Sequence, residues 1–188
     1  MSLNRYKATD LTILLIIMCA IETISLLVLK RVGSQFVLSV IVPVTLIVFI
    51  RWNAFGLIHA FVGGILEAAV ITYYNGDMTL FTVARSATIY GVGYLCTAAA
   101  MLTFIKGKDT VTEKWWLTAL YALIAFIAMC FGRAVTATIF GEDFLSILLE
   151  YLLREALNLI FTVLVLLVAR RQNGFLSDQK EYFYSARK

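Results

Sequence analysis

The sequence predicts an all-α integral membrane protein with six transmembrane helices, and two observations lead to this fold class. Of the 188 residues, 61% are hydrophobic and only 15% are charged, and the mean hydropathy is +0.88. A soluble chain of this length could not bury so much apolar surface. Several apolar runs also approach or exceed the roughly 20 residues that cross about 30 Å of hydrocarbon, so residues 1–188 are expected to form one multi-pass membrane domain.

The predicted spans are six apolar runs, at residues 11–29, 36–50, 54–73, 81–105, 115–140 and 144–168. The second run is short and contains the only proline, Pro43, so this span is expected to be tilted, kinked or extended by its flanks. Residues 172–188 are polar and are expected to form a short disordered cytosolic tail. The alternative for this tail is that its aromatic residues lie at the lipid interface.

The orientation follows from the lysines and arginines outside the spans. They gather at the N-terminus, at Arg51, in the loop 106–114 and in the tail, whereas the opposite loops carry only Lys30 and Arg31. Positive charge favours the cytoplasmic side, which predicts a cell-membrane protein with both termini in the cytoplasm. These basic residues thus report topology rather than nucleic-acid binding.

The three cysteines, Cys19, Cys96 and Cys130, lie inside apolar runs without C-x-x-C spacing. This pattern is typical of packing residues rather than metal ligands, and no metal or cofactor is expected.

Charged side chains inside the predicted spans are the strongest functional signal. The set comprises Glu22, Glu67, Arg85, Arg133, Glu150, Arg154 and Glu155, joined by His59. Each costs at least about 2.5–3.5 kcal/mol when it faces lipid near the bilayer centre, so the set must be paired or line a wet cavity. A rise of about 1.5 Å per residue places most of them in the extracellular half, which favours a pocket open to the outside over a through-channel.

The predicted ligand-binding residues are Glu67, Arg85, Tyr90, Arg133, Glu150, Tyr151, Arg154 and Asn158. Four-residue spacing puts Glu150, Arg154 and Asn158 on one helix face, which is expected to point inward. Arginines with tyrosines suit a small, partly aromatic, polar or charged solute. The structural alternative is that Glu150 and Arg154 form an intrahelical pair and that Glu67 bridges to Arg85. His59 is interpreted as a hydrogen-bonded packing residue.

Small residues recur every four positions in the third span, at Gly56, Ala60, Gly64 and Ala68. Such a ridge allows another helix to approach closely. It is expected either to pack inside the chain or to dock a second membrane subunit.

Residues 41–69 resemble the substrate-binding S components of energy-coupling factor (ECF) vitamin transporters. The similarity lies in a short second span with a proline, an Arg-Trp-Asn turn at 51–53 and a Gly/Ala-rich third span with Val-Gly-Gly at 62–64. It implies a receptor for a vitamin or similar micronutrient, with its site in the outer half and the Lys30–Gln35 loop as a lid. It further implies a coupling subunit and two ATPases as partners, and this chain, which lacks a phosphate-binding loop, is expected not to be an enzyme.

The sequence departs from the family at the docking face. Many members carry Ala-xxx-Ala on the first helix, and here the nearest equivalent is Ala8 with Thr12. The ridge residues Gly56, Ala60 and Gly64 therefore become additional docking candidates. Two other functional classes remain as alternatives. A small membrane scaffold such as an MreD-like cell-shape protein would use the buried charges structurally, whereas an intramembrane protease of the CAAX type needs more than the single histidine present.

Overall fold

The computed structural model describes residues 2–31, 38–172 and 174–185, and within these ranges the chain is helical without any strand. The elements are α1 (Leu3–Arg31), α2 (Ile41–Trp52), η1 (Asn53–Phe55), α3 (Gly56–Asn75), α4 (Leu80–Cys96), η2 (Thr97–Lys106), α5 (Lys108–Glu113), α6 (Trp115–Ile139), α7 (Phe144–Arg154), α8 (Ala156–Arg170) and α9 (Gln179–Ser185). The all-α prediction is confirmed for this part of the chain.

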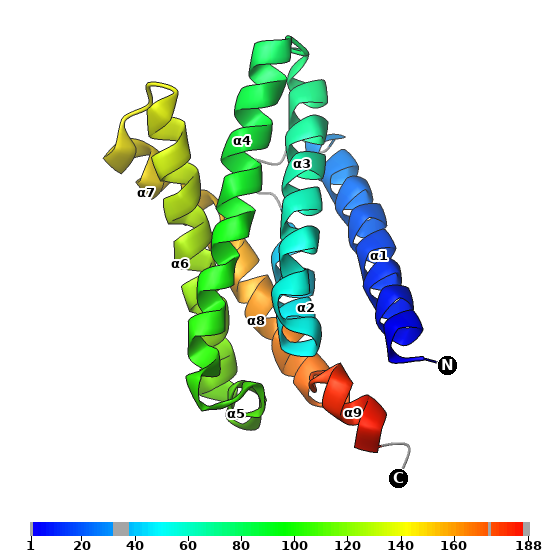
Figure 1. Ribbon diagram of the computed structural model, residues 1–188. Coiled ribbons are helices and arrows are strands. Elements are labelled where there is room, and N and C mark those ends of the chain that lie inside the picture. Colours follow the sequence, from blue (N-terminus) through cyan, green and yellow to red (C-terminus); the bar gives the residue numbers. More distant parts are fainter. Residues whose placement is uncertain (1, 32–37, 173, 186–188) are drawn as a thin grey trace.

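Long helices run side by side as a bundle (Figure 1). The hairpin of α3 and α4 occupies the centre, α6 packs on α4, and α1 flanks α3 on the other side. Both described ends of the chain lie at the same end of the bundle, which we call the basal end. The loop between α3 and α4 and the start of α7 lie at the opposite end, which we call the distal end.

Four helical stretches are long and apolar enough to cross a membrane: Leu3–Val28, Ile41–Asn75, Leu80–Ile105 and Trp115–Ile139. The pair of α7 and α8 passes the same test together, although it is bent by 45°. The structure thus agrees with a membrane protein that has four or five candidate spans. The second and third predicted spans fall within the single stretch Ile41–Asn75.

That stretch reverses direction in its middle. Asn53 has a φ of 55°, a left-handed conformation that turns the chain sharply between α2 and α3. A Cβ atom built on Gly56 would lie 2.5 Å from the Phe49 ring, and one on Gly63 would lie 2.5 Å from Ile41. The two helices therefore pack antiparallel, with no room for larger residues at these glycines. With 12 residues, α2 is only about 18 Å long, shorter than the roughly 30 Å hydrocarbon core.

The described part of the predicted disordered tail, residues 174–185, is instead folded against the basal end. The Tyr6 hydroxyl donates to Gln179 Oε1 at 2.7 Å, and the Tyr6 ring stacks on Phe183 with 5.6 Å between centroids. Leu176 is buried ahead of α9. The aromatic and apolar residues of the tail supply enough contact to order it. The polar composition of the segment as a whole had predicted disorder.

Candidate functional site

Arg133 lies at the centre of a buried polar cluster in the bundle. Its side chain projects from α6 and is completely buried. One terminal nitrogen donates to Glu155 Oε1 at 2.6 Å, and the other donates to Glu67 Oε2 at 3.2 Å. A single guanidinium therefore joins carboxyl groups from α3 and from the junction of α7 with α8.

Hydrogen bonds continue from these carboxyl groups until they close a ring. The Tyr94 hydroxyl donates to Glu67 Oε2 at 2.5 Å, and Ser39 Oγ lies 3.2 Å from the Tyr94 oxygen. The Ser39 backbone N–H donates to Asn158 Oδ1 at 2.7 Å, and Asn158 Nδ2 donates to Glu155 Oε2 at 2.5 Å. We call this cycle the polar ring, and its members are Ser39, Glu67, Tyr94, Arg133, Glu155 and Asn158.

Glu22 attaches the first helix to the ring. Its Oε2 accepts the Val40 backbone N–H at 2.8 Å and the Ser39 hydroxyl at 3.1 Å, so this carboxyl group caps the start of α2. The side chain is fully buried, and Oε1 has no hydrogen-bond partner within the described ranges. Glu22, a charged residue in the otherwise apolar part of α1, thus holds the start of α2 in position.

The hydroxyl protons in this region can be counted. The row of Glu67, Tyr94, Ser39 and Glu22 contains three oxygen-to-oxygen contacts, at 2.5, 3.2 and 3.1 Å, but only two hydroxyl protons. A third hydrogen bond requires a proton on one of the two carboxyl groups. Such a proton also reduces the excess of three carboxyl groups over one guanidinium in this part of the bundle.

Aromatic rings enclose the guanidinium. The centroids of Tyr90, Tyr94 and Tyr151 lie 4.5, 4.6 and 5.9 Å from Arg133 Cζ, within the range of cation–π attraction. Gly93 makes this arrangement possible, because a Cβ atom there would lie 2.2 Å from Arg133 Cγ. The pairing of a glycine on α4 with an arginine on α6 lets the two helices pack closely around a charged side chain.

A helix break places Glu155 in the ring. The bend of 45° between α7 and α8 occurs at this residue. It separates Asn158, which is buried in the ring, from Glu150, whose side chain is 59% exposed. The prediction that Glu150, Arg154 and Asn158 share one inward face is therefore wrong, because the face does not continue across the bend. Glu150 and Arg154 instead approach each other at 4.0 Å, as in the intrahelical alternative.

The predicted bridge between Glu67 and Arg85 is also absent. Arg85 binds Glu142 instead, and their side chains are 34% and 44% exposed. The Arg85 guanidinium lies 6.0 Å from the centroid of the Phe140 ring. This pair joins the distal ends of α4 and α6, away from the polar ring.

The docking candidates divide by exposure. Ala8 and Thr12 are exposed on α1, whereas Gly56, Ala60 and Gly64 are buried inside the chain. A Cβ atom on Gly64 would lie 2.8 Å from the Gly91 Cα atom of α4, and one on Gly56 would lie 2.5 Å from the Phe49 ring of α2, so these ridge residues pack inside the chain and leave no surface for a partner. The lid segment Lys30–Gln35 falls largely outside the described residues.

His59 occupies a packing position, as the sequence indicates. It is buried, and its Nε2 lies 3.1 Å from the Leu11 carbonyl oxygen. Within the described ranges, no group of three histidine, cysteine or acidic side chains is arranged to hold a metal ion.

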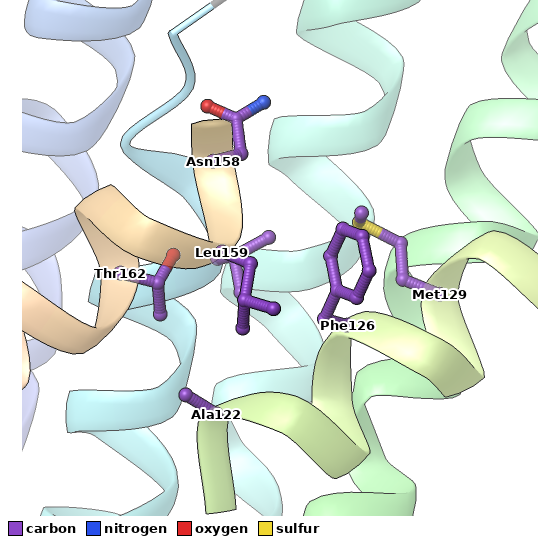
Figure 2. A pocket seen from close by; sticks show the side chains of 7 residues that line it. Ala122, Phe126, Met129, Asn158, Leu159 and Thr162 are labelled. Carbon is purple, nitrogen blue, oxygen red and sulfur yellow. The ribbon is translucent and has the colours of Figure 1, made fainter. Parts of the chain in front are cut away.

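A narrow apolar gap lies beside the polar ring, between α6 and α8 (Figure 2). No part of it is wide enough for a water molecule. Asn158 lies at one side of the gap, and Thr162, one turn along α8, has a buried hydroxyl without a partner in the described chain. The gap can hold no solute unless the helices separate.

Sequence reasoning found some ring members and missed others. Glu67, Arg133 and Asn158 belong to the predicted site, and Tyr90 and Tyr151 lie beside Arg133. Glu155 is predicted only as an intramembrane charge, and the predicted site does not include Ser39. Its position just before Pro43 in an otherwise apolar run was the available signal.

Comparison of the chain with known protein families, with curated proteins and with solved structures gives no match.

Proposed function

We propose that this chain is the solute-binding membrane subunit of an ECF-type importer and captures a vitamin or similar micronutrient. In this proposal the chain crosses the bilayer six times, with α2 as a short second pass and with α7 and α8 together as the last. The basal end faces the cytoplasm. The presence of both termini at that end supports an even number of passes, and the basic residues there support the orientation.

The observation that carries the proposal is a pair of buried guanidinium Nε atoms that have no hydrogen-bond acceptor in the described part of the chain. The Nε atoms of Arg133 and Arg154 are buried and have no acceptor among the described residues. A buried donor without a partner costs about 1–3 kcal/mol, and a bound carbonyl or carboxylate removes that cost. Tyr90 and Tyr151 provide aromatic surface for the remainder of a solute.

The polar ring supports the same interpretation, because burying its charged groups costs free energy. Charged groups inside a membrane bundle are rarely retained for stability, since apolar residues of similar volume pack as well or better. The ring would form the floor of the site, and the bend at Glu155 would allow α7 to move while α8 stays packed. The chain would deliver the solute together with a coupling subunit and two ATPases, whose ATP hydrolysis supplies the energy.

A thermal-shift screen of vitamins and nucleobases with the purified protein, in the absence of nucleotide, tests the proposal. One compound at 100 times its Kd should stabilise the protein by about 2.7 kcal/mol. Arg154→Gln should abolish this shift and leave the unliganded protein folded, whereas Glu142→Gln, in the exposed distal pair, should keep it. Failure of every compound to stabilise the protein would count heavily against a solute-binding role.

The second candidate is a membrane scaffold of the MreD-like kind, and the closure of the polar ring favours it. Most polar groups of the ring satisfy one another without any ligand. Arg133→Leu separates the two candidates. A folded variant that no longer binds a solute supports the importer subunit, whereas lost assembly with partner proteins and no ligand effect supports the scaffold.

A further inference from the structure

A second polar site lies at the basal end, far along the bundle from the ring. A pocket of about 360 Å³ is formed there by the start of α1, the turn after α2, α5 and the segment that leads into α9. Its charged and aromatic lining consists of Lys7, Arg51, Lys108, Lys180, Asp178, Trp52 and Phe55. Four cations and one carboxylate therefore face the same space.

Two of these cations are already neutralised. Arg51 Nε and Nη2 donate to the two oxygens of Asp10, at 3.0 and 2.7 Å. Lys108 Nζ lies 2.5 Å from Asp178 Oδ2. These ion pairs join α1 to α2 and α5 to the tail, so they form the rigid walls of the pocket.

The other two cations remain without a counterion. Neither Lys7 nor Lys180 forms an ion pair with any carboxylate in the described ranges. Lys7 Nζ is held 3.2 Å from the centroid of the Phe55 ring and 5.7 Å from that of Trp52. The aromatic rings fix the ammonium group at the pocket, but they do not cancel its charge. The pocket thus offers two uncompensated positive charges to an anion.

We infer that this pocket binds the phosphate of an anionic phospholipid from the leaflet at the basal end. The pocket opens at the end of spanning helices, where a headgroup phosphate would lie, and basic pockets between helices at this level suit anionic headgroups. Tryptophan rings such as Trp52 prefer the same depth. The bound lipid would tie α1 to α9, because Lys7 and Lys180 come from these two helices.

A neighbouring pocket provides a matched control. Trp115, Arg170 and Arg171 line a separate hollow of about 560 Å³ at the basal end. Arg170 already donates to the Glu113 carbonyl oxygen at 2.8 Å. Replacing these two arginines removes as much charge from the same end as replacing Lys7 and Lys180, but it leaves the inferred site intact.

The test is a titration of the full-length protein in neutral detergent micelles with dioctanoyl phosphatidylglycerol. Dioctanoyl phosphatidylcholine and inorganic phosphate serve as parallel probes. Wild-type protein should bind the anionic lipid and prefer it to the zwitterionic one. Lys7→Gln with Lys180→Gln should weaken binding about thirtyfold, on the basis of the usual contribution of a basic residue near an anionic lipid surface. Arg170→Gln with Arg171→Gln should change it less than threefold.

Three outcomes would overturn the inference. Equal weakening by the two double variants would show general attraction to the basal end rather than a site. Equal binding of the two lipids would exclude recognition of the negative charge. Competition by inorganic phosphate at the concentration of the lipid would identify a soluble anion as the ligand. If the lysine double variant unfolds without lipid, Lys180→Gln alone carries the test, because this side chain is exposed and its loss should weaken binding about fivefold.

Discussion

Arg51 and Arg133 are both bound by carboxyl groups and aromatic rings, yet they stabilise the molecule in different ways. Arg51 lies at the basal end and forms a two-pronged pair with the single carboxylate of Asp10, while its third nitrogen donates to the Phe175 carbonyl oxygen at 2.7 Å. Arg133 lies inside the bundle and divides its two terminal nitrogens between Glu67 and Glu155. At the basal end one positive charge faces one negative charge, whereas inside the bundle one positive charge faces two carboxyl groups.

The difference lies in what remains when the arginine is removed. At the basal end, Asp10 keeps the Trp52 indole N–H as a donor at 2.5 Å and is close to solvent, with 17% of its side chain exposed. In the polar ring, two carboxyl groups remain with side chains that are at most 4% exposed. The ion pair near water stabilises the fold by joining two helices. The arginine inside the bundle is needed because, without its charge, the two carboxylates could not be buried at an acceptable cost.

The largest expected effect is that of Arg133→Met. It leaves two buried carboxyl groups without their cation and should lower the free energy of unfolding by about 3–5 kcal/mol. Unfolding by denaturant in micelles, followed by tryptophan fluorescence, measures the loss.

The control is the triple variant Arg133→Met, Glu67→Gln, Glu155→Gln. It should regain part of the lost stability, because the stranded carboxyl groups are removed with the cation. A triple variant less stable than Arg133→Met alone would show that the ring contributes through its hydrogen bonds rather than through charge balance.

Arg51→Gln should have an intermediate effect. Loss of the paired hydrogen bonds to Asp10 should cost about 1–3 kcal/mol, since the pair is mostly buried but its carboxylate retains other contacts. Asp10→Asn should cost a similar amount, and the double variant should cost less than the sum of the two, because both substitutions break one interaction. Additive losses of unfolding free energy in the same assay would show that Arg51 and Asp10 stabilise the fold through separate interactions.

The smallest effect is expected at Asp178, the acid that pairs with Lys108. Burial raises the pKa of this carboxyl group, but hydrogen bonds from Lys108 Nζ and from the Lys180 backbone outweigh it, so the pKa lies below the ordinary 3.8. A group with a lowered pKa in the folded state stabilises the fold fully above its unfolded pKa, and this contribution is lost as the pH falls through the folded value.

The stability of wild-type protein relative to Asp178→Asn should therefore be constant near neutral pH and disappear at pH values below 3.8. A stability difference that grows as the pH falls would reverse the expected sign.

The sequence predicted the helical class and the approximate positions of the helices, because long apolar runs allow few other structures in a membrane. It also placed Glu67 and Arg133 at a similar depth, and the two side chains are in contact. It could not choose among partners, because the rotation of each helix about its axis depends on packing. The absence of a Cβ atom at Gly93, for example, leaves the space in which Arg133 lies beside Tyr90 and Tyr94.

The helix break at Glu155 could not be predicted from the sequence, because it also depends on packing. Residues 150–160 contain neither proline nor glycine, so no local signal marks the bend between α7 and α8. The bend exists where the Glu155 side chain reaches Arg133 on α6, a contact with a residue 22 positions earlier in the chain. The docked tail escaped prediction likewise, since its partners Tyr6 and Arg51 are far away in the sequence.

The closed ring also constrains how the protein is made. Glu67 precedes Arg133 by 66 residues, which at ordinary translation rates corresponds to about 3–13 s during which Glu67 lacks its counterion. Glu22 and Ser39 emerge earlier still, and Asn158, near the start of α8, is the last member of the ring to be made. A nascent chain must therefore keep Glu22 and Glu67 protonated, hydrated or otherwise shielded until Arg133 and Asn158 have been made. Chains that stop short of α8 lack Asn158, and they leave the Ser39 backbone N–H and Glu155 without this partner.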